Sequence, residues 1–180
     1  ARVRTMSLEE YAQAPGNKDS FCYWVKERMK EAGSLGNTFP ANTFGIYRRD
    51  PKNTDGKTGL AEEGGYLWLP SLGGDTAQEA FEAMRDRIVA TIEAAQAGDL
   101  AAISQIHGFD LFRWKLAYLY APDKVVPIYN REHLKAAARE LGMPNYQQAS
   151  YAARHRYILA NLPEGLDAFT YMHDFYERNR

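Results

Sequence analysis

Residues 76–99, TAQEAFEAMRDRIVATIEAAQAGD, carry the clearest secondary-structure signal in the chain. Thr76 and Glu79 have the spacing of a capping box, in which each side chain accepts a hydrogen bond from the backbone N–H of the other residue. Apolar residues then recur at helical spacings, namely Phe81, Met84, Ile88 and Ile92. Gly98 ends this pattern, and Asp99 is placed to cap a short second helix. We therefore predict an amphipathic helix over residues 76–97.

The sequence before this helix predicts strands. Residues 42–50, NTFGIYRRD, alternate in polarity, and residues 65–70, GYLWLP, form a second run rich in aromatic side chains. The charged and glycine-rich residues 51–64 separate these two runs. Such an arrangement indicates a hairpin with a long loop, and loops of that length are often functional. Further upstream, residues 17–31 predict another helix, which ends at Gly33.

The sequence after residue 99 is mostly helical. Asn130 is placed to cap a helix that ends before Gly142, and two further helices are predicted over about 145–161 and 165–178. Residues 110–120 favour a strand, because alternate positions are apolar or aromatic, namely Phe112, Trp114, Leu116, Tyr118 and Tyr120. A helix is the alternative for this segment, since Leu, Lys and Ala are good helix formers.

These elements predict an α+β fold, with a single compact domain, a small mixed or antiparallel sheet and five to six helices packed on it. Residues 1–16 form an N-terminal lead-in, residues 17–142 the α+β core, and residues 143–180 the C-terminal helices. A chain of 180 residues, 45% of them hydrophobic, suits one such domain. No apolar run is long enough for a membrane span, and the single cysteine, Cys22, suits a reducing compartment. We therefore expect a cytoplasmic protein with no membrane partner.

Residues 50–59, DPKNTDGKTG, resemble the end of a phosphate-binding P-loop. Pro51 stands where that loop requires a glycine, and proline has neither the backbone N–H nor the conformational freedom that the loop needs. Asp55 and Lys57 match half of a metal-dependent nuclease centre, but they lie in a glycine-rich loop instead of a rigid strand. Cys22 and the four scattered histidines form no nucleophile or metal pattern. We predict a protein without catalytic residues, metal ions or cofactors.

The same loop predicts a binding surface. Basic residues gather at the end of the first strand and in the loop, in a chain whose net charge is only −1: Arg48, Arg49, Lys52 and Lys57. Basic side chains that contact phosphates supply most of the affinity for nucleic acid. Aromatic rings beside them are candidates for stacking on a base: Tyr47, Tyr66 and Trp68, with Trp114 and Tyr118 as weaker candidates. We expect Trp68 to be a site residue and Trp114 to be core. The alternative is a solvated loop tip, with all these rings packed in the core.

The order of several segments resembles an N-terminal module of McrB-like AAA+ proteins. The segments are FCYWVKERMKEAGSLGNTFPANTFGIYRR (21–49), GYLWLP (65–70), AFEAMRDRIVATIEAAQAGDLAAI (80–103) and FRWKLAYLYAPDKVVPIYNREHLKAAARELG (112–142). Those proteins are the motor subunits of restriction systems that recognise modified cytosine. The resemblance covers about residues 18–142 and implies a module that binds DNA, with cleavage by a partner nuclease. The P-loop that the family's motor needs is absent from this chain.

Two hypotheses from different classes follow. The first is a DNA-binding specificity module of a modification-dependent restriction or phage-defence system, which reads a modified cytosine and works with AAA+ motor and nuclease subunits. The second is a sensor domain that binds a protein or a small ligand and has no nucleic-acid role. A third hypothesis, a nuclease, depends on Asp55 and Lys57 alone. The salt dependence of binding separates the first two, because phosphate contacts weaken steeply with salt and apolar docking does not.

Overall fold

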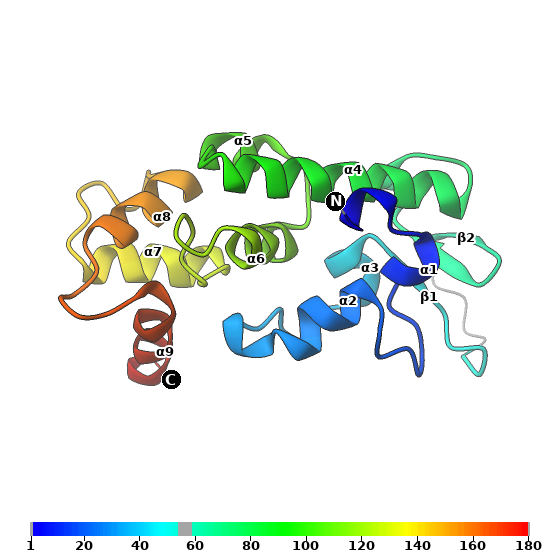
Figure 1. Ribbon diagram of the computed structural model, residues 1–180, viewed down its shortest axis with the longest axis horizontal. Coiled ribbons are helices and arrows are strands. Elements are labelled where there is room, and N and C mark those ends of the chain that lie inside the picture. The colour runs from blue at the N-terminus through cyan, green and yellow to red at the C-terminus, as the bar shows by residue number, and fades with distance from the viewer. Residues whose placement is uncertain (1, 54–58, 180) are drawn as a thin grey trace. The chain divides into compact units, whose positions relative to one another are not determined.

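The computed structural model describes residues 2–53 and 59–179, and Figure 1 labels most of their helices and strands. The chain divides into two compact units, Ala1–Val89 and Ala90–Arg180, called the first and second unit below. Helix α4 (Ala77–Gln96) begins in the first unit and ends in the second. None of the described helices combines the length and the hydropathy that a membrane crossing requires.

The first unit begins with short helical segments. They are η1 (Arg2–Thr5), α1 (Leu8–Tyr11), α2 (Phe21–Tyr23), η2 (Trp24–Arg28), η3 (Lys30–Ala32) and α3 (Pro40–Phe44). The predicted helix over 17–31 is confirmed only from Phe21 onward, because the Ser20 hydroxyl caps α2 by accepting from the Tyr23 N–H at 3.2 Å. The α-helical turn then passes into the π-helical η2 and the 3-10 helix η3. Gly33, with φ 98°, follows η3 as predicted.

The sheet of the first unit has three antiparallel strands in the order β1-β3-β2. They are β1 (Ile46–Arg48), β2 (Ala61–Glu63) and β3 (Tyr66–Trp68), so β3 is central. The two predicted strands correspond to β1 and β3, but residues 42–44 belong to helix α3. Strand β2 was not predicted, because its sequence, Ala-Glu-Glu, has neither apolar alternation nor β-branched side chains. Gly64 and Gly65, with φ 57° and 83°, form the tight turn between β2 and β3.

Helix α4 follows the prediction closely. The Glu79 N–H donates to the Thr76 hydroxyl at 3.2 Å, and the Thr76 N–H donates to the Glu79 carboxylate at the same distance, so the capping box is present. The predicted apolar face, with Phe81, Met84 and Ile88, is buried. Periodicity and capping together therefore located this helix from sequence alone.

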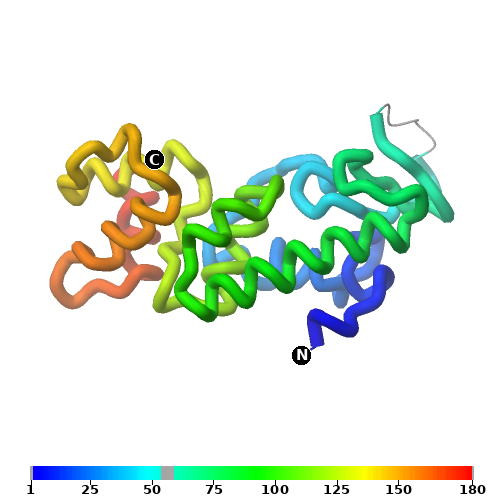
Figure 2. Tube along the Cα trace, turned by 90° about the horizontal axis from the view of Figure 1, so that it is seen from above, coloured from blue at the N-terminus to red at the C-terminus, as the bar shows by residue number. Residues whose placement is uncertain are grey.

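The described residues of the second unit form helices and no strand. After the end of α4 these are α5 (Leu100–Gln105), α6 (Asp110–Tyr120), α7 (Arg131–Glu140), α8 (Tyr151–Ala160) and α9 (Ala168–Arg178). Figure 2 shows α7 to α9 gathered in the yellow-to-red part of the tube. Asp99 and Asn130 cap α5 and α7 as predicted, and Ser150 and Asp167 cap α8 and α9.

The strand prediction for residues 110–120 is wrong, because this segment is helix α6. Residues 112–117 are all buried, including Arg113 and Lys115. A helix buried on nearly every side has apolar residues at many positions, and some of these also match an alternating pattern. The alternation of apolar and aromatic side chains in this segment therefore did not indicate a strand.

The second unit contains two hydrophobic clusters. One surrounds Trp114 and includes Leu100, Ile103, Val125 and Tyr129. The other joins α7, α8 and α9 through side chains such as Leu134, Ile158, Tyr171 and Phe175. The α+β fold class is confirmed: within the residues that the structure describes, a three-stranded antiparallel sheet occurs together with nine α-helices, more helices than predicted.

Candidate functional site

The basic surface predicted in the first unit is only partly present. Arg48, at the end of β1, is exposed, and its guanidinium carbon lies 5.6 Å from the ring centroid of Tyr66, its partner across the sheet on β3. Lys52 is also exposed. Lys57 lies outside the described residues, as does Asp55 of the nuclease hypothesis. Arg48 and Tyr66 line a groove of about 530 Å³, so a contact surface at this place stays a prediction.

Arg49 is tied to the sheet. Its guanidinium forms an ion pair with Glu62 on β2, and only 21% of its side chain is exposed. Its positive charge is thereby largely compensated. Asp50 adds a carboxylate beside Lys52 and accepts a hydrogen bond from the Lys52 backbone N–H at 2.9 Å. The described part of this surface therefore carries much less net positive charge than the sequence suggested.

Most of the predicted stacking residues are core residues. Trp68 is 1% exposed and Tyr47 is 8% exposed, so neither ring offers a face to a base. Tyr47 pairs with Leu67 and Trp68 pairs with Ile46, so the two rings lie on opposite faces of the sheet, and both faces are covered at these positions. The expectation that Trp68 is a site residue is therefore corrected. Tyr66 is half-buried and stays a candidate for stacking on a base.

The two weaker candidates lie on α6. Trp114 is fully buried, as expected for a core residue. Tyr118 is half-buried and packs against the cluster around Trp114, and burial raises the pKa of its hydroxyl. Cys22 is also buried, and this burial raises the pKa of its thiol well above its ordinary value, which fits a packing role.

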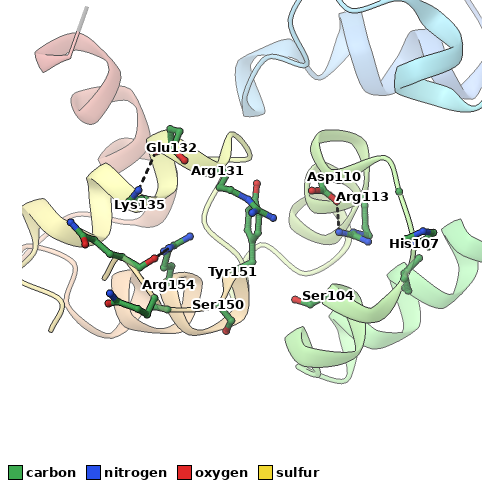
Figure 3. Close-up of a pocket in the computed structure, with 15 residues that line it drawn as sticks. Ser104, His107, Asp110, Arg113, Arg131, Glu132, Lys135, Ser150, Tyr151 and Arg154 are labelled. Carbon is green, nitrogen blue, oxygen red and sulfur yellow. Dashed lines mark hydrogen bonds and ion pairs between the residues drawn. The ribbon is translucent and has the colours of Figure 1, made fainter. Parts of the chain in front are cut away.

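The second unit contains a cavity of about 570 Å³ that the sequence did not predict (Figure 3). We call it the cationic pocket. Four basic and two acidic side chains line it, namely Arg113, Arg131, Lys135, Arg154, Asp110 and Glu132. The volume lies in the range of sites that hold small molecules or single nucleotide units.

The N-terminal ends of three helices meet at this pocket. Asp110 and Arg113 come from the first turns of α6, Arg131 and Glu132 begin α7, and Tyr151 begins α8. The first N–H groups of a helix and the helix dipole give its N-terminus a partial positive charge. Cations in the first turns of helices are electrostatically unfavourable there, and an anion in the pocket would compensate them.

Arg113 is held at the wall of the pocket. The residue is 7% exposed, and its Nη2 donates to Asp110 Oδ1 at 2.5 Å. Its Nε is buried without a hydrogen-bond partner. Burial lowers the pKa of this guanidinium, which Asp110 partly offsets. Because buried donors are normally satisfied, Arg113 has hydrogen-bonding capacity left for a ligand.

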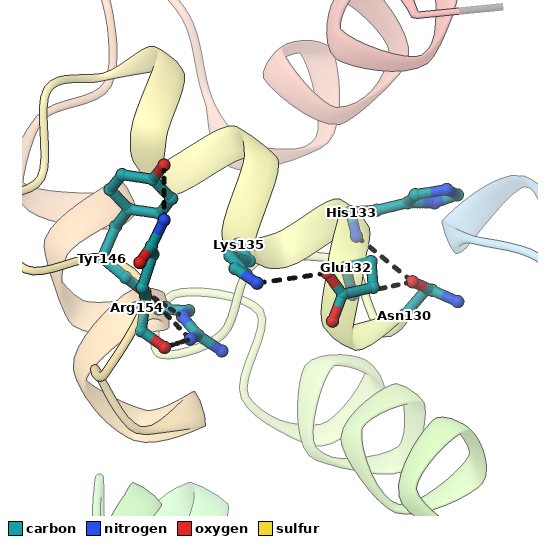
Figure 4. Close-up of polar contacts among 7 residues, drawn as sticks. Asn130, Glu132, His133, Lys135, Tyr146 and Arg154 are labelled. Atoms are coloured by element: carbon teal, nitrogen blue, oxygen red, sulfur yellow. Dashed lines mark hydrogen bonds and ion pairs between the residues drawn. The ribbon is translucent and has the colours of Figure 1, made fainter.

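Arg154 is fixed by backbone carbonyls (Figure 4). Its Nε and Nη2 donate to the Tyr146 carbonyl oxygen at 3.0 and 2.9 Å, and Nη2 also donates to that of Gln147 at 3.1 Å. Burial lowers the pKa of Arg154, and the nearby positive charge of Arg131 lowers it further. The two guanidinium groups thus lie within electrostatic range of each other.

Tyr151 forms a rigid platform inside the pocket. Its ring stacks on Trp114 with centroids 5.2 Å apart and an interplanar angle of 10°, and His155 stacks on the same indole at 4.6 Å. The Tyr151 hydroxyl donates to the Tyr129 carbonyl oxygen at 2.7 Å. The guanidinium carbon of Arg131 lies 5.7 Å from the centroid of the Tyr151 ring (Figure 3). Burial raises the pKa of Tyr151 to about 12, so the hydroxyl stays protonated.

The charges of the pocket do not cancel. Asp110 compensates Arg113, and Glu132 lies 3.4 Å from the Lys135 ammonium (Figure 4). Arg131 and Arg154 have no ion pair within residues 2–53 and 59–179. The pocket therefore keeps a formal excess of two positive charges. Such an arrangement can bind a dianion.

The sequence contained a signal for this pocket. Arg131 follows the capping residue Asn130 directly, and Arg154 lies four residues after the capping residue Ser150. A cation so close to a helix N-terminus is unfavourable for the stability of the helix, so its presence there indicates another role. The predicted strand over 110–120 concealed the third helix, so Arg113 could not be placed beside them.

The described residues contain no group of His, Cys, Asp or Glu side chains that could hold a metal ion. Comparisons with protein-family models, with curated proteins and with solved structures give no match for this chain. The fold and the site therefore define the class of the protein by themselves: an α+β protein whose helical second unit carries a cationic pocket.

Proposed function

We propose that this protein binds DNA and that the cationic pocket of the second unit holds a phosphate group of the DNA. The observation that carries the proposal is the formal excess of two positive charges in a cavity where three helix N-termini meet. Arginine is well suited to this role, because its planar guanidinium donates two parallel hydrogen bonds to phosphate oxygens.

The aromatic platform formed by Tyr151 and Arg131 favours nucleic acid over other anions as the ligand of the pocket. Tyr151 and Arg131 together present a flat, cationic surface beside the phosphate position. Bases stack on tyrosine rings and on guanidinium planes, and this contact tolerates any base. A site for inorganic anions alone would not need such a surface.

The resemblance to McrB-like proteins supports a narrower version of the proposal. The protein would then be the DNA-specificity module of a modification-dependent restriction system, with a separate AAA+ motor and a separate nuclease as partners. A panel of duplexes with unmodified cytosine, 5-methylcytosine and 5-hydroxymethylcytosine tests this version. Equal affinity for all three would leave DNA binding in place and remove the reading of a modified base.

The pocket itself is tested by two variants that remove the same charge from the same helix. Arg131 lines the pocket, whereas Arg139 is exposed on α7 and does not line it. We expect Arg131→Ala to weaken the binding of a DNA duplex about tenfold, because a hydrogen bond to a charged group contributes about 1.5–3 kcal/mol. Arg139→Ala should change the affinity little. An equal effect of the two substitutions, or no effect of either, would reject the pocket as the DNA site.

A further inference from the structure

Two of the four basic side chains that line the cationic pocket are buried. Arg113 is 7% and Arg154 is 5% exposed, although both line the pocket. The unpartnered Nε of Arg113 is buried. An anion must therefore reach into the pocket to contact these two side chains.

An internal phosphodiester enters with difficulty. It carries one negative charge and a nucleoside on each side, and in a duplex the neighbouring phosphates follow at short spacing along the backbone. A terminal phosphate is attached on one side only and carries about 1.5–2 negative charges near pH 7. Its charge matches the formal excess of two positive charges, and its free oxygens can reach buried donors.

The Arg131–Tyr151 pair offers a contact surface for the nucleoside next to that phosphate. Arg131 and Tyr151 lie together in Figure 3, and both line the same cavity as Arg113. Tyr151 is held from behind by Trp114 and by its hydrogen bond to the Tyr129 carbonyl oxygen. It therefore loses little conformational freedom when a base or sugar packs against it.

We infer that the cationic pocket takes the terminal phosphate of a nucleic acid strand, with Arg113 and Arg154 around the phosphate and the Arg131–Tyr151 pair against the last nucleoside. This inference rests on the proposed function and names its ligand more closely. The terminal phosphomonoester of a free nucleotide shares this chemistry, and the experiment below distinguishes the two sources.

The test compares single strands of one sequence that carry a phosphate at the 5′ end, at the 3′ end or at neither end. Fluorescence anisotropy gives the affinity of the full chain for each strand. We expect a strand with a terminal phosphate to bind about 10- to 100-fold more tightly than the strand without one, as the gain of one or two charge-assisted hydrogen bonds implies. Equal affinity of the wild-type protein for all three strands would overturn the inference.

Two variants locate the effect. Arg113→Gln should remove the preference for the phosphorylated end. Because Arg113 is buried, Arg131→Gln at an exposed position provides a second variant that does not depend on the packing of α6. Arg139→Gln is the matched control and should keep the full preference. A preference that survives both pocket variants would contradict the assignment.

The outcomes separate the inference from the proposed function. If the three strands bind equally but Arg131→Gln weakens all of them, the pocket binds DNA and the terminal phosphate is rejected. If Arg131→Gln and Arg139→Gln both bind every strand as the wild type does, the proposed function fails as well. A deoxynucleoside 5′-monophosphate serves as competitor. Displacement of the phosphorylated strand at equal concentration would assign the pocket to a free nucleotide, and weak competition supports the strand end.

Discussion

Trp68 shows how one residue separates a core role from a binding role. Its indole lies on the central strand β3 and pairs across the sheet with Ile46 and Ala61. It is 1% exposed, so we expect Trp68→Ala to lower the free energy of unfolding by about 3–5 kcal/mol, the usual cost of truncating a buried tryptophan. Urea denaturation measures this loss. DNA affinity at low temperature should stay unchanged while the fold persists.

Tyr66→Ala is the control on the same strand. Tyr66 is half-buried and packs under Arg48, so its truncation should cost clearly less stability than that of Trp68. A Trp68→Ala protein that keeps its stability but loses DNA affinity would restore Trp68 as a stacking residue.

His155 gives the stability of the second unit a pH dependence. The imidazole is fully buried against Trp114, its Nδ1 accepts from the Val126 N–H at 3.2 Å, and burial lowers its pKa from 6.5 to about 3. Below pH 6.5 the unfolded chain binds a proton at this position and the folded chain does not. The contribution of His155 to stability is therefore full above pH 6.5 and is lost as the pH falls toward 3, by about 1.4 kcal/mol per pH unit.

Urea denaturation at pH 7.0 and pH 5.0 tests this dependence. We expect His155→Gln, which cannot titrate, to be less stable than the wild type at pH 7.0 and to show a smaller loss of stability between the two pH values. The comparison with the wild type removes the contribution of the carboxylates, which are the same in both proteins. Identical losses in the two proteins would show that the pKa of His155 is the same in the folded and the unfolded chain.

At the scale of the element, helix α7 depends on its cap. The Asn130 side chain accepts from the N–H groups of Glu132 and His133 at 2.9 and 3.1 Å (Figure 4). Asn130→Ala should lower the free energy of unfolding by about 1 kcal/mol, because two N–H groups lose their acceptor. Asn130→Asp keeps the acceptor and should retain the stability. Thermal or urea denaturation of the two variants measures the difference, and an equal loss in both would assign the effect to packing.

The elements also show which parts of the fold were readable from sequence. Helix α4 and the caps of α5 and α7 are local features, so the spacing of a few neighbouring residues revealed them. Strand β2 exists because it pairs with β3, and nothing in Ala-Glu-Glu itself favours a strand. Helix α6 was predicted only as the alternative to a strand, because it is buried on nearly every side and this removes the amphipathic period.

The candidate site was harder to predict, because its residues are brought together by contacts between segments that are distant in sequence. Three basic residues lie near one another in sequence: Arg48, Arg49 and Lys52. They do not form one positive patch, because the ion pair with Glu62 compensates the charge of Arg49. The cationic pocket instead combines side chains from Ser104 to Arg154, which only the packing of four helices brings together. Long-range packing of this kind leaves no pattern at short spacing in the sequence.

At the scale of the whole molecule, the formal net charge is only −1 at pH 7. The chain as a whole therefore provides no attraction for DNA, and any affinity must come from a local excess of positive charge. The formal excess of two positive charges in the cationic pocket lies in the second unit.

This local origin predicts a shallow dependence of DNA affinity on salt. If the pocket holds one phosphate group of a duplex, the plot of log affinity against log salt concentration should have a slope of about −0.9, because each phosphate contact contributes about −0.9. Arg131→Ala should reduce the magnitude of this slope, and Arg139→Ala should leave it unchanged. Anisotropy titrations at four salt concentrations measure the slopes. A loss of affinity in Arg131→Ala without a change in slope would mean that Arg131 acts by packing on Tyr151, and that the phosphate is held elsewhere.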